Sequence, residues 1–209
     1  MYGLVNQGVR DLALQLGGEH LWQEIRAAAE VDDQTFIAMG NYSDDITYRL
    51  VDAASGVLGL STSEVLEAFG RHWILYTARQ GYGAFFDAMG RSLPEFLANL
   101  DAMHARLSLS MPELRPPSFV CEQLDGARIR VEYWSDRPGL APMVHGLLGG
   151  LGELFGLTLS IHHSVSRTTG ADHDEFLVNY APAVSGWERE HGLHEPLDGS
   201  AVPPVGTYG

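Results

Sequence analysis

Cysteine, basic residues and long uncharged apolar runs are all scarce in this chain, and each shortage excludes a class of protein. The single cysteine, Cys121, rules out a disulfide framework and any zinc site built from several cysteines. Only 13 lysine and arginine residues accompany 27 aspartate and glutamate residues, which gives a formal net charge of −14 at pH 7. A chain this acidic is a poor binder of nucleic-acid phosphates or of an anionic membrane surface.

Signals for export or membrane insertion are also missing. Met1 is followed by no basic segment and no small-residue cleavage motif, so we expect no signal peptide and a cytoplasmic location. The most apolar stretch, residues 140–161, is interrupted by His145 and Glu153, and its apolar side chains recur at helical spacing. This pattern predicts an amphipathic core helix rather than a membrane span.

The composition favours a folded domain with an apolar interior. The 209 residues are 45% hydrophobic, enough for one large domain or two small ones with a sizeable core. Charged residues make up only 19% of the chain, against about 25% in a typical domain. Because nine histidines occur among so few charges, we expect some of them inside a pocket.

Hydrophobic periodicity and capping signals predict that the first half of the chain is helical. Helices are expected at 4–16, 20–29, 44–59, 61–79, 82–89 and 92–110. Ser61 and Glu64 form a capping box, Asp44 or Asp45 is expected to cap the third helix, and Ser92 is expected to cap the last.

The period then changes to that of strands. Strands are expected at 118–124 and 127–134 around an Asp-Gly turn, and at 157–165 and 175–180, with a helix at 140–155 between the two pairs. The predicted fold class is α+β, with a helical N-terminal part and a four-stranded antiparallel sheet. Residues 183–209 are rich in glycine and proline and are predicted to form a tail.

His104 is the first candidate functional residue. It follows Leu100 by four positions and Leu97 by seven, so it shares the apolar stripe of the predicted helix. Taken alone, a core histidine with a satisfied hydrogen bond explains this position. A neutral imidazole that faces an apolar cavity is also the form taken by a metal or haem-iron ligand.

Tyr133, Ser135 and Arg137 form the second candidate, at the end of a predicted strand. Side-chain alternation places all three on one side, where a phenol, a hydroxyl and a guanidinium converge. That set suits a carboxylate, because arginine binds it through two hydrogen bonds and the hydroxyls donate further ones. The alternative is a turn-capping arginine beside a packed tyrosine.

Other segments carry weaker signals. Residues 115–117 contain two prolines and mark a rigid helix exit. His162 and His163 point to opposite faces of a strand and cannot share one metal, and residues 172–174 (Asp-His-Asp) are expected in a solvated polar loop. The sequence contains no phosphate-binding loop, nucleophile elbow or paired-cysteine motif, and no nucleophile–base pair is evident.

Four segments together resemble the haem nitric-oxide/oxygen-binding (H-NOX) family, the sensor domain shared by soluble guanylate cyclases and bacterial NO receptors. They are Met1-Tyr2-Gly3-Leu4-Val5-Asn6, Leu100-Asp101-Ala102-Met103-His104, Leu114-Arg115-Pro116-Pro117-Ser118-Phe119 and Tyr133-x-Ser135-x-Arg137. The resemblance runs from Met1 to about Tyr180. It is specific because a histidine and a double proline precede the Y-x-S-x-R motif at the family's spacing.

The resemblance implies a haem b group buried between a helical distal part, at about 1–60, and a proximal part, at about 61–182, of one domain over 1–182. It makes His104 the proximal ligand of the iron, and it makes Tyr133, Ser135 and Arg137 the clamp on the haem propionates. Pro117 takes the place of the proline that presses on the porphyrin and distorts it, which is one of the ways a protein tunes haem.

The resemblance also implies a preference among gases. Members that bind O2 carry a tyrosine on the helix after Y-x-S-x-R, and Met143 stands at that position here. The rest of an apolar distal pocket is supplied by Val5, Val9, Leu147 and Thr77. We therefore expect NO and CO as ligands and poor O2 binding. Trp73 stands where O2-binding members carry a polar partner of that tyrosine. Because its indole N–H is a hydrogen-bond donor, an O2 sensor that uses Trp73 as the donor is the alternative.

The function expected from this resemblance is a sensor without catalysis of its own. A haem enzyme of the peroxidase or NO dioxygenase type is the alternative, but such enzymes need a distal acid–base residue, and His72 lies about 100° around the helix from Trp73. A non-haem interaction domain is a third class. Bacterial members of this size signal to histidine kinases or cyclic-di-GMP enzymes, so we expect such a partner in trans, with no nucleic acid and no membrane.

Overall fold

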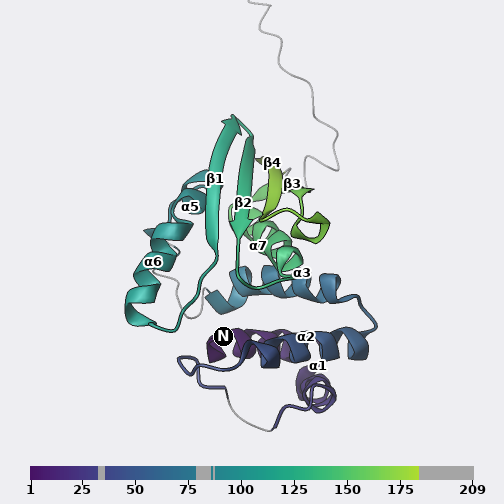
Figure 1. Cartoon of the computed structure of the whole chain (residues 1–209). Coiled ribbons are helices and arrows are strands. Elements are labelled where there is room, and N and C mark those ends of the chain that lie inside the picture. Colours follow the sequence, from purple (N-terminus) through teal and green to yellow (C-terminus); the bar gives the residue numbers. More distant parts are fainter. Residues whose placement is uncertain (33–35, 79–85, 87, 184–209) are drawn as a thin grey trace, which may run out of the picture.

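Helices come first and an antiparallel sheet follows, which confirms the predicted α+β class (Figure 1). The computed structural model describes residues 1–32, 36–78, 86 and 88–183. Within these residues the elements in chain order are α1 (Gly3–Ala28), α2 (Asp44–Leu58), α3 (Thr62–His72), the π-helix η1 (Trp73–Ala78), α5 (Leu93–Ala98), α6 (Leu100–Ser110), β1 (Ser118–Asp125), β2 (Arg128–Trp134), α7 (Ala141–Leu154), β3 (Leu157–Val165), the 3-10 helix η2 (Arg167–Thr169) and β4 (Asp174–Pro182).

The four strands form one antiparallel sheet in the order β1-β2-β4-β3. Strand β2 lies inside the sheet, and its side chains alternate as the sequence predicts. Ile129, Val131 and Tyr133 are buried, whereas the intervening arginines and glutamate are not. The last pairs between β2 and β4 set Tyr133 opposite Asp174 and Glu132 opposite Glu175.

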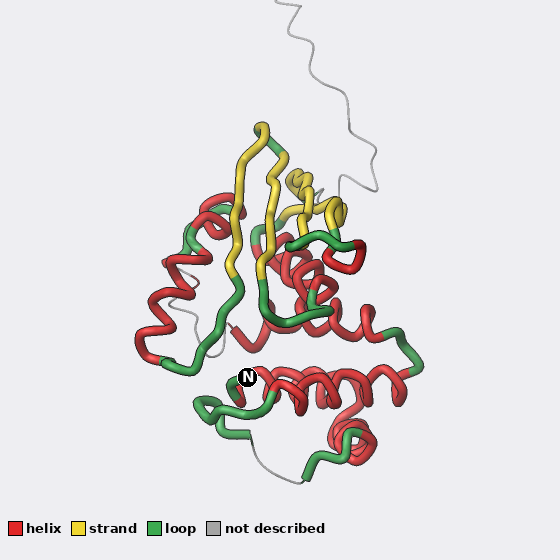
Figure 2. Tube along the Cα trace, in the orientation of Figure 1, coloured by secondary structure: helices red, strands yellow, loops and turns green. Residues whose placement is uncertain are grey.

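The molecule has two separate hydrophobic cores. Figure 2 shows α1 and α2 as a lower layer and the sheet with its helices as an upper layer, with α3 between α2 and α7. The first core is formed by α1, α2 and α3. The second is formed by α5, α7 and the strands β2 and β4. Trp73 and Leu140 pack against both cores, so the two layers meet at these side chains.

Two glycines allow α3 and α7 to pack closely. A Cβ atom on Gly146 of α7 would lie 2.0 Å from the backbone oxygen of Glu67, and one on Gly70 of α3 would lie 2.1 Å from that of Met143. Only a residue without a side chain fits such backbone contacts. The contacts fix where α7 presents Met143 and Leu147 relative to Trp73 at the end of α3.

Two predicted features of the helical half, a helix cap and an uninterrupted helix, are corrected. Ser43, not Asp44 or Asp45, caps α2, because its hydroxyl accepts a hydrogen bond from the backbone N–H of Asp45. The predicted 92–110 helix is interrupted at Asn99, whose amide donates to the carbonyls of Met89 and Glu95. An asparagine that bonds the backbone in this way competes with the helix.

The fourth predicted helix changes its hydrogen-bonding pattern. It begins at the Ser61–Glu64 capping box, as expected, but from Trp73 to Ala78 it is a π-helix. The break expected at Gly17 and Gly18 is a kink inside α1, where Gly18 has a φ of +67°.

Some predictions lie outside the described residues or are not tested. The helix expected at 82–89 is described only at 86, 88 and 89, and the tail expected at 183–209 only at 183. The domain limits of 1–182, with parts meeting near residue 60, stay predictions. Among the described helices none combines the length and the apolar character needed to cross a membrane.

The contact between α3 and α7 predicts a large effect of one methyl group. Gly146→Ala should lower the free energy of unfolding by about 1–3 kcal/mol, because the added Cβ overpacks a backbone contact. Gly149→Ala is the matched control, since no atom lies within 4 Å of its Cβ position. That control should be neutral or gain up to about 1 kcal/mol from helix propensity. Urea unfolding curves measure both, and equal values for the two variants would contradict the close approach.

Candidate functional site

A cavity lies where the two layers meet. Its volume is about 310 Å³, within the range of small-molecule sites, and its walls are mostly apolar. The wall residues come from α1, α2, α3, η1, α5, α6, β1, β2, α7 and the segment between α6 and β1. Nearly every part of the described chain therefore contributes to this one space.

His104 brings an imidazole to this cavity from α6. Its Nδ1 atom is buried and has no hydrogen-bond partner among the described residues. Burial lowers the pKa of His104, against smaller raising effects of the Asp101 charge and the Pro117 backbone. The side chain is therefore neutral at physiological pH, which is the form that binds a metal ion.

Asp101 fixes the position of α6. Its carboxylate accepts hydrogen bonds from the Ser118 hydroxyl at 2.7 Å and from the Phe119 backbone N–H at 2.8 Å. These bonds tie the helix to the start of β1, and the Phe119 ring lies 6.2 Å from that of His104. Pro117, directly before β1, lines the same cavity as His104.

Tyr133, Ser135 and Arg137 all line the cavity, where β2 ends. Tyr133 is buried, and burial raises the pKa of its phenol. The Ser135 hydroxyl accepts a hydrogen bond from the Arg137 backbone N–H at 3.1 Å. The turn after β2 thus holds the three polar side chains along one edge of an apolar space.

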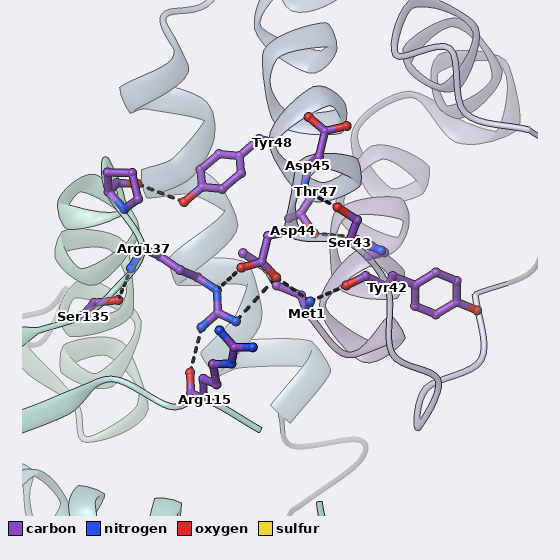
Figure 3. Close-up of polar contacts among 12 residues, drawn as sticks. Met1, Tyr42, Ser43, Asp44, Asp45, Thr47, Tyr48, Arg115, Ser135 and Arg137 are labelled. Carbon is purple, nitrogen blue, oxygen red and sulfur yellow. Dashed lines mark hydrogen bonds and ion pairs between the residues drawn. The ribbon is translucent and has the colours of Figure 1, made fainter. Parts of the chain in front are cut away.

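Arg137 connects the two layers through Asp44 at the start of α2 (Figure 3). Its Nε atom donates to Asp44 at 2.7 Å, and its Nη1 atom donates to the Arg115 carbonyl at 2.7 Å. The Met1 ammonium lies 2.5 Å from the same carboxylate and donates to the Tyr42 carbonyl. Sequence reasoning expected Asp44 only as a helix cap, because nothing local relates it to a residue 93 positions away.

A second polar chain holds the Ser135 segment from the opposite side. Arg167 donates from Nη1 to the Ser135 carbonyl at 2.6 Å, and its backbone N–H donates to Asp174 at 3.1 Å. His163 contacts the same Asp174 oxygen at 2.9 Å. The expectation that residues 172–174 form a solvated loop is wrong for Asp174, which belongs to β4 and is 5% exposed.

The wall formed by α1, η1 and α7 carries most of the residues expected in a distal pocket. Val5, Trp73, Met143 and Leu147 line the cavity. Val9 does not: it is buried in the core of α1, α2 and α3. The side chain of Thr77 lies outside the described residues. The indole N–H of Trp73 has no hydrogen-bond partner among the described residues.

Two tyrosine hydroxyls near the cavity are engaged elsewhere. The Tyr2 oxygen accepts a hydrogen bond from the Glu113 backbone N–H at 3.2 Å, and the Tyr48 hydroxyl donates to the Pro138 carbonyl at 3.0 Å. His72 is buried and stacks on Tyr76 with ring centroids 5.0 Å apart, but it is not part of the cavity wall. His104 is thus the one histidine among the described wall residues.

A family model described as haem-NO-binding (HNOB) matches residues 2–163 of the chain. Soluble guanylate cyclase gcy-35 of Caenorhabditis elegans is 32% identical over 152 residues, which are 71% of this chain and 22% of that protein. Guanylate cyclase soluble subunit beta-2 of Rattus norvegicus is 36% identical over 121 residues, 54% of this chain and 18% of that protein. The chain spans about a quarter of the length of such curated relatives.

Solved structures share the fold over nearly their whole length. An H-NOX protein from S. oneidensis in the Fe(II)NO ligation state has a TM-score of 0.77 and 21% identity, and the match covers 87% of this chain and 99% of that one. An Fe(II) unliganded H-NOX protein mutant from K. algicida has a TM-score of 0.75 and 20% identity, with 90% and 99% covered. At such identities the likeness establishes the fold.

The link between Asp44 and Arg137 predicts a pH-dependent loss of stability. Burial raises the pKa of Asp44, but hydrogen bonds from the Met1 ammonium and Arg137 outweigh it and hold that pKa below 3.8. A depressed carboxyl pKa stabilises the fold above the unfolded value, and this contribution disappears as the pH falls through the folded value. Asp44→Asn should therefore cost roughly 0.5–1 kcal/mol at pH 7 for so exposed a pair, and less as the pH approaches 3.

The matched control for this prediction is Asp45→Asn. Asp45 occupies the same first turn of α2 and pairs only with Arg49, four residues on. Denaturation of the three proteins at pH 7 and pH 3 provides the measurement. A deficit of Asp44→Asn that stays constant across this range would show that the carboxylate charge is not what joins the layers.

Proposed function

Because the chain belongs to the haem-NO-binding family, we propose that its cavity is the gas site of a haem sensor, with His104 as the axial ligand of the iron. The observation that carries this proposal is the buried, unpartnered imidazole nitrogen of His104 in an apolar cavity. A buried polar atom without a partner costs about 1–3 kcal/mol. Coordination of a metal offsets this cost.

The other wall residues fit the remaining parts of a haem. The apolar walls suit the porphyrin ring, and the polar edge at Tyr133, Ser135 and Arg137 suits its two propionates. Arg137 offers a guanidinium already held by Asp44 and the Arg115 carbonyl, so little side-chain freedom is lost on binding. When bound, the haem supplies one chemical property, an iron coordination position that a diatomic gas can take.

The expected gas preference rests on the wall of α1, η1 and α7. Polarity and donors near the gas decide whether O2 is held, whereas NO needs no donor. Val5, Met143 and Leu147 offer none, and the Tyr48 hydroxyl donates to the Pro138 carbonyl. The Tyr2 oxygen accepts the Glu113 backbone N–H, a bond that places this hydroxyl beside the segment between α6 and β1. This arrangement supports binding of NO and CO and exclusion of O2.

Trp73 supports a second candidate function, an O2 sensor. Trp73 lines the cavity, and its indole N–H has no hydrogen-bond partner among the described residues, so we treat it as a candidate donor. The ring is held in place by Phe69, whose centroid is 6.0 Å away, and by close contact with Gly8. A ring held in this way mainly reduces the space inside the cavity, rather than bringing its N–H group to a bound gas. We therefore place NO sensing first.

We propose signalling rather than catalysis as the output. Among the described wall residues His104 is the one histidine, and His72 lies outside the wall, so the acid–base group of a peroxidase is missing there. A displacement of the His104 imidazole would move α6, and the hydrogen bonds of Asp101 to Ser118 and Phe119 would transmit that movement to the start of β1. Pro117 directly precedes these two residues. The α1–α2 layer and the sheet layer, joined by Asp44 and Arg137, would then shift against each other as a two-state element.

The receiver of the signal stays a prediction. A histidine kinase or a cyclic-di-GMP enzyme remains the expected partner in trans. The net charge of −14 supports a basic face on that partner, since opposite potentials promote association.

The role of His104 is tested by imidazole rescue. His104→Gly should lose haem, recorded as Soret absorbance per chain, and should recover it when millimolar imidazole replaces the missing ligand. His145→Ala is the control, because His145 pairs with Glu67 and is not part of the cavity wall. Full haem content and an unchanged spectrum in His104→Gly without imidazole would overturn the assignment.

The gas preference is tested by spectra of the ferrous protein. We expect shifts with NO and with CO, and no stable shift in air. Trp73→Phe removes the N–H and keeps a ring of similar packing. If air shifts the parent spectrum and Trp73→Phe abolishes that shift, the O2 sensor is correct and the NO-selective reading is wrong.

A further inference from the structure

A cluster of metal-ligating side chains lies on the sheet face opposite to Tyr133. Glu132 of β2, Glu175 of β4 and His173, directly before β4, each offer one ligand atom, and these atoms lie within 4.8 Å of one another. None of the three residues lines the cavity. Their side chains are sheltered, with exposed fractions of 25% for Glu132, 17% for Glu175 and 20% for His173.

The two glutamates are direct cross-strand partners. Like charges placed opposite each other on a sheet destabilise it unless a cation intervenes. Arg130 lies 4.0 Å from Glu132 and 3.9 Å from Glu175, but it pairs most closely with a third acid, Glu122. One guanidinium is therefore shared by three carboxylates, and the charges of Glu132 and Glu175 are not fully neutralised.

His173 is oriented as a metal ligand commonly is. Its Nδ1 atom lies 2.7 Å from the Asp172 carboxylate, and its ring stacks on Trp134 with centroids 4.4 Å apart. A carboxylate on one ring nitrogen fixes the tautomer and makes the other nitrogen a better ligand. The loop was expected to be solvated, and its histidine is instead packed against β2.

We propose that Glu132, His173 and Glu175 bind a divalent transition-metal ion of the zinc type. Mixed imidazole and carboxylate ligands favour such ions, whereas Mg²⁺ and Ca²⁺ prefer oxygen ligands alone. Three protein ligands and one water complete a tetrahedral zinc site, in which neighbouring ligand atoms are about 3.4 Å apart. Small rotations of two long glutamate side chains bring the three ligand atoms from within 4.8 Å to that separation.

The ion would join β2 to β4 where the two strands carry the haem edge. Glu132 precedes Tyr133, and Glu175 follows Asp174, whose carboxylate holds Arg167 and through it the Ser135 carbonyl. Binding at this site does not require haem, so the proposal stands or falls apart from the gas-sensing function.

Calorimetric titration of ZnCl2 into the haem-loaded full chain tests the site. The tail contains His191 and His194, so all proteins carry alanine at both positions. We expect one zinc ion per chain, at least about 10-fold weaker binding in His173→Ala and Glu175→Gln, and about 10–100-fold weaker binding in Asp172→Asn. Asp125→Asn is the acidic control and should bind like the parent, because Asp125 pairs with Arg128 rather than with Arg130. MgCl2 should give no comparable binding.

Thermal unfolding with and without zinc gives a second readout. Glu132→Gln removes the like-charge pair, so it should raise the melting temperature without zinc and abolish the rise that zinc causes in the parent. Zinc affinity that is unchanged in His173→Ala and Glu175→Gln would overturn the proposal. So would a zinc-induced rise that persists in Glu132→Gln, or a loss of zinc affinity in Asp125→Asn as large as in the ligand variants.

Discussion

The structure depends on keeping one neutral imidazole in an apolar cavity between two cores. His104 gains no protein hydrogen bond at Nδ1 among the described residues, and burial lowers its pKa. The fold therefore accepts a local loss of stability at His104, which the proposed coordination of the haem iron would offset. The surrounding elements serve this arrangement: Asp101 fixes the helix that bears the histidine, and the end of β2 supplies the polar groups that such a cavity otherwise lacks.

Two different kinds of contact fix how the two layers sit around the cavity. Close backbone contact at Gly70 and Gly146 sets the distance between α3 and α7, and with it the wall that carries Trp73 and Met143. The bonds from Arg137 to Asp44 tie the outer helices to the sheet layer at the opposite edge. The first contact is rigid, whereas the second is partly exposed and more readily broken. Relative motion of the layers is therefore easiest at the polar edge.

Local patterns predicted most of the fold, whereas the candidate site residues followed from the family resemblance, because local patterns at His104 and at the end of β2 equally fitted ordinary core and turn residues. Long-range polar contacts were out of reach of both. Alternation in β2 and the Ser61–Glu64 capping box depend on neighbours in the chain, so they can be recognised in a single sequence. The partnerships of Arg137 with Asp44 and of Arg167 with Ser135 join residues far apart, and no spacing rule relates them. The interruption at Asn99 and the π-helix after His72 also depend on tertiary context. Val9, which the resemblance placed in the distal pocket, packs in the core of α1, α2 and α3.

Strand register couples the two faces of the sheet. Because side chains alternate along a strand, Tyr133 lines the cavity while Glu132 lies on the opposite face. On β4 Asp174 is buried on the Tyr133 face, where it bonds Arg167, while Glu175 lies on the Glu132 face. A slip of one residue between β2 and β4 would exchange these faces and destroy both arrangements together. An ion bridging Glu132 and Glu175 would therefore hold Tyr133 opposite Asp174 through the same register. An ion on the outer face would thus stabilise the proposed propionate edge without touching it, because successive residues on each strand point to opposite faces.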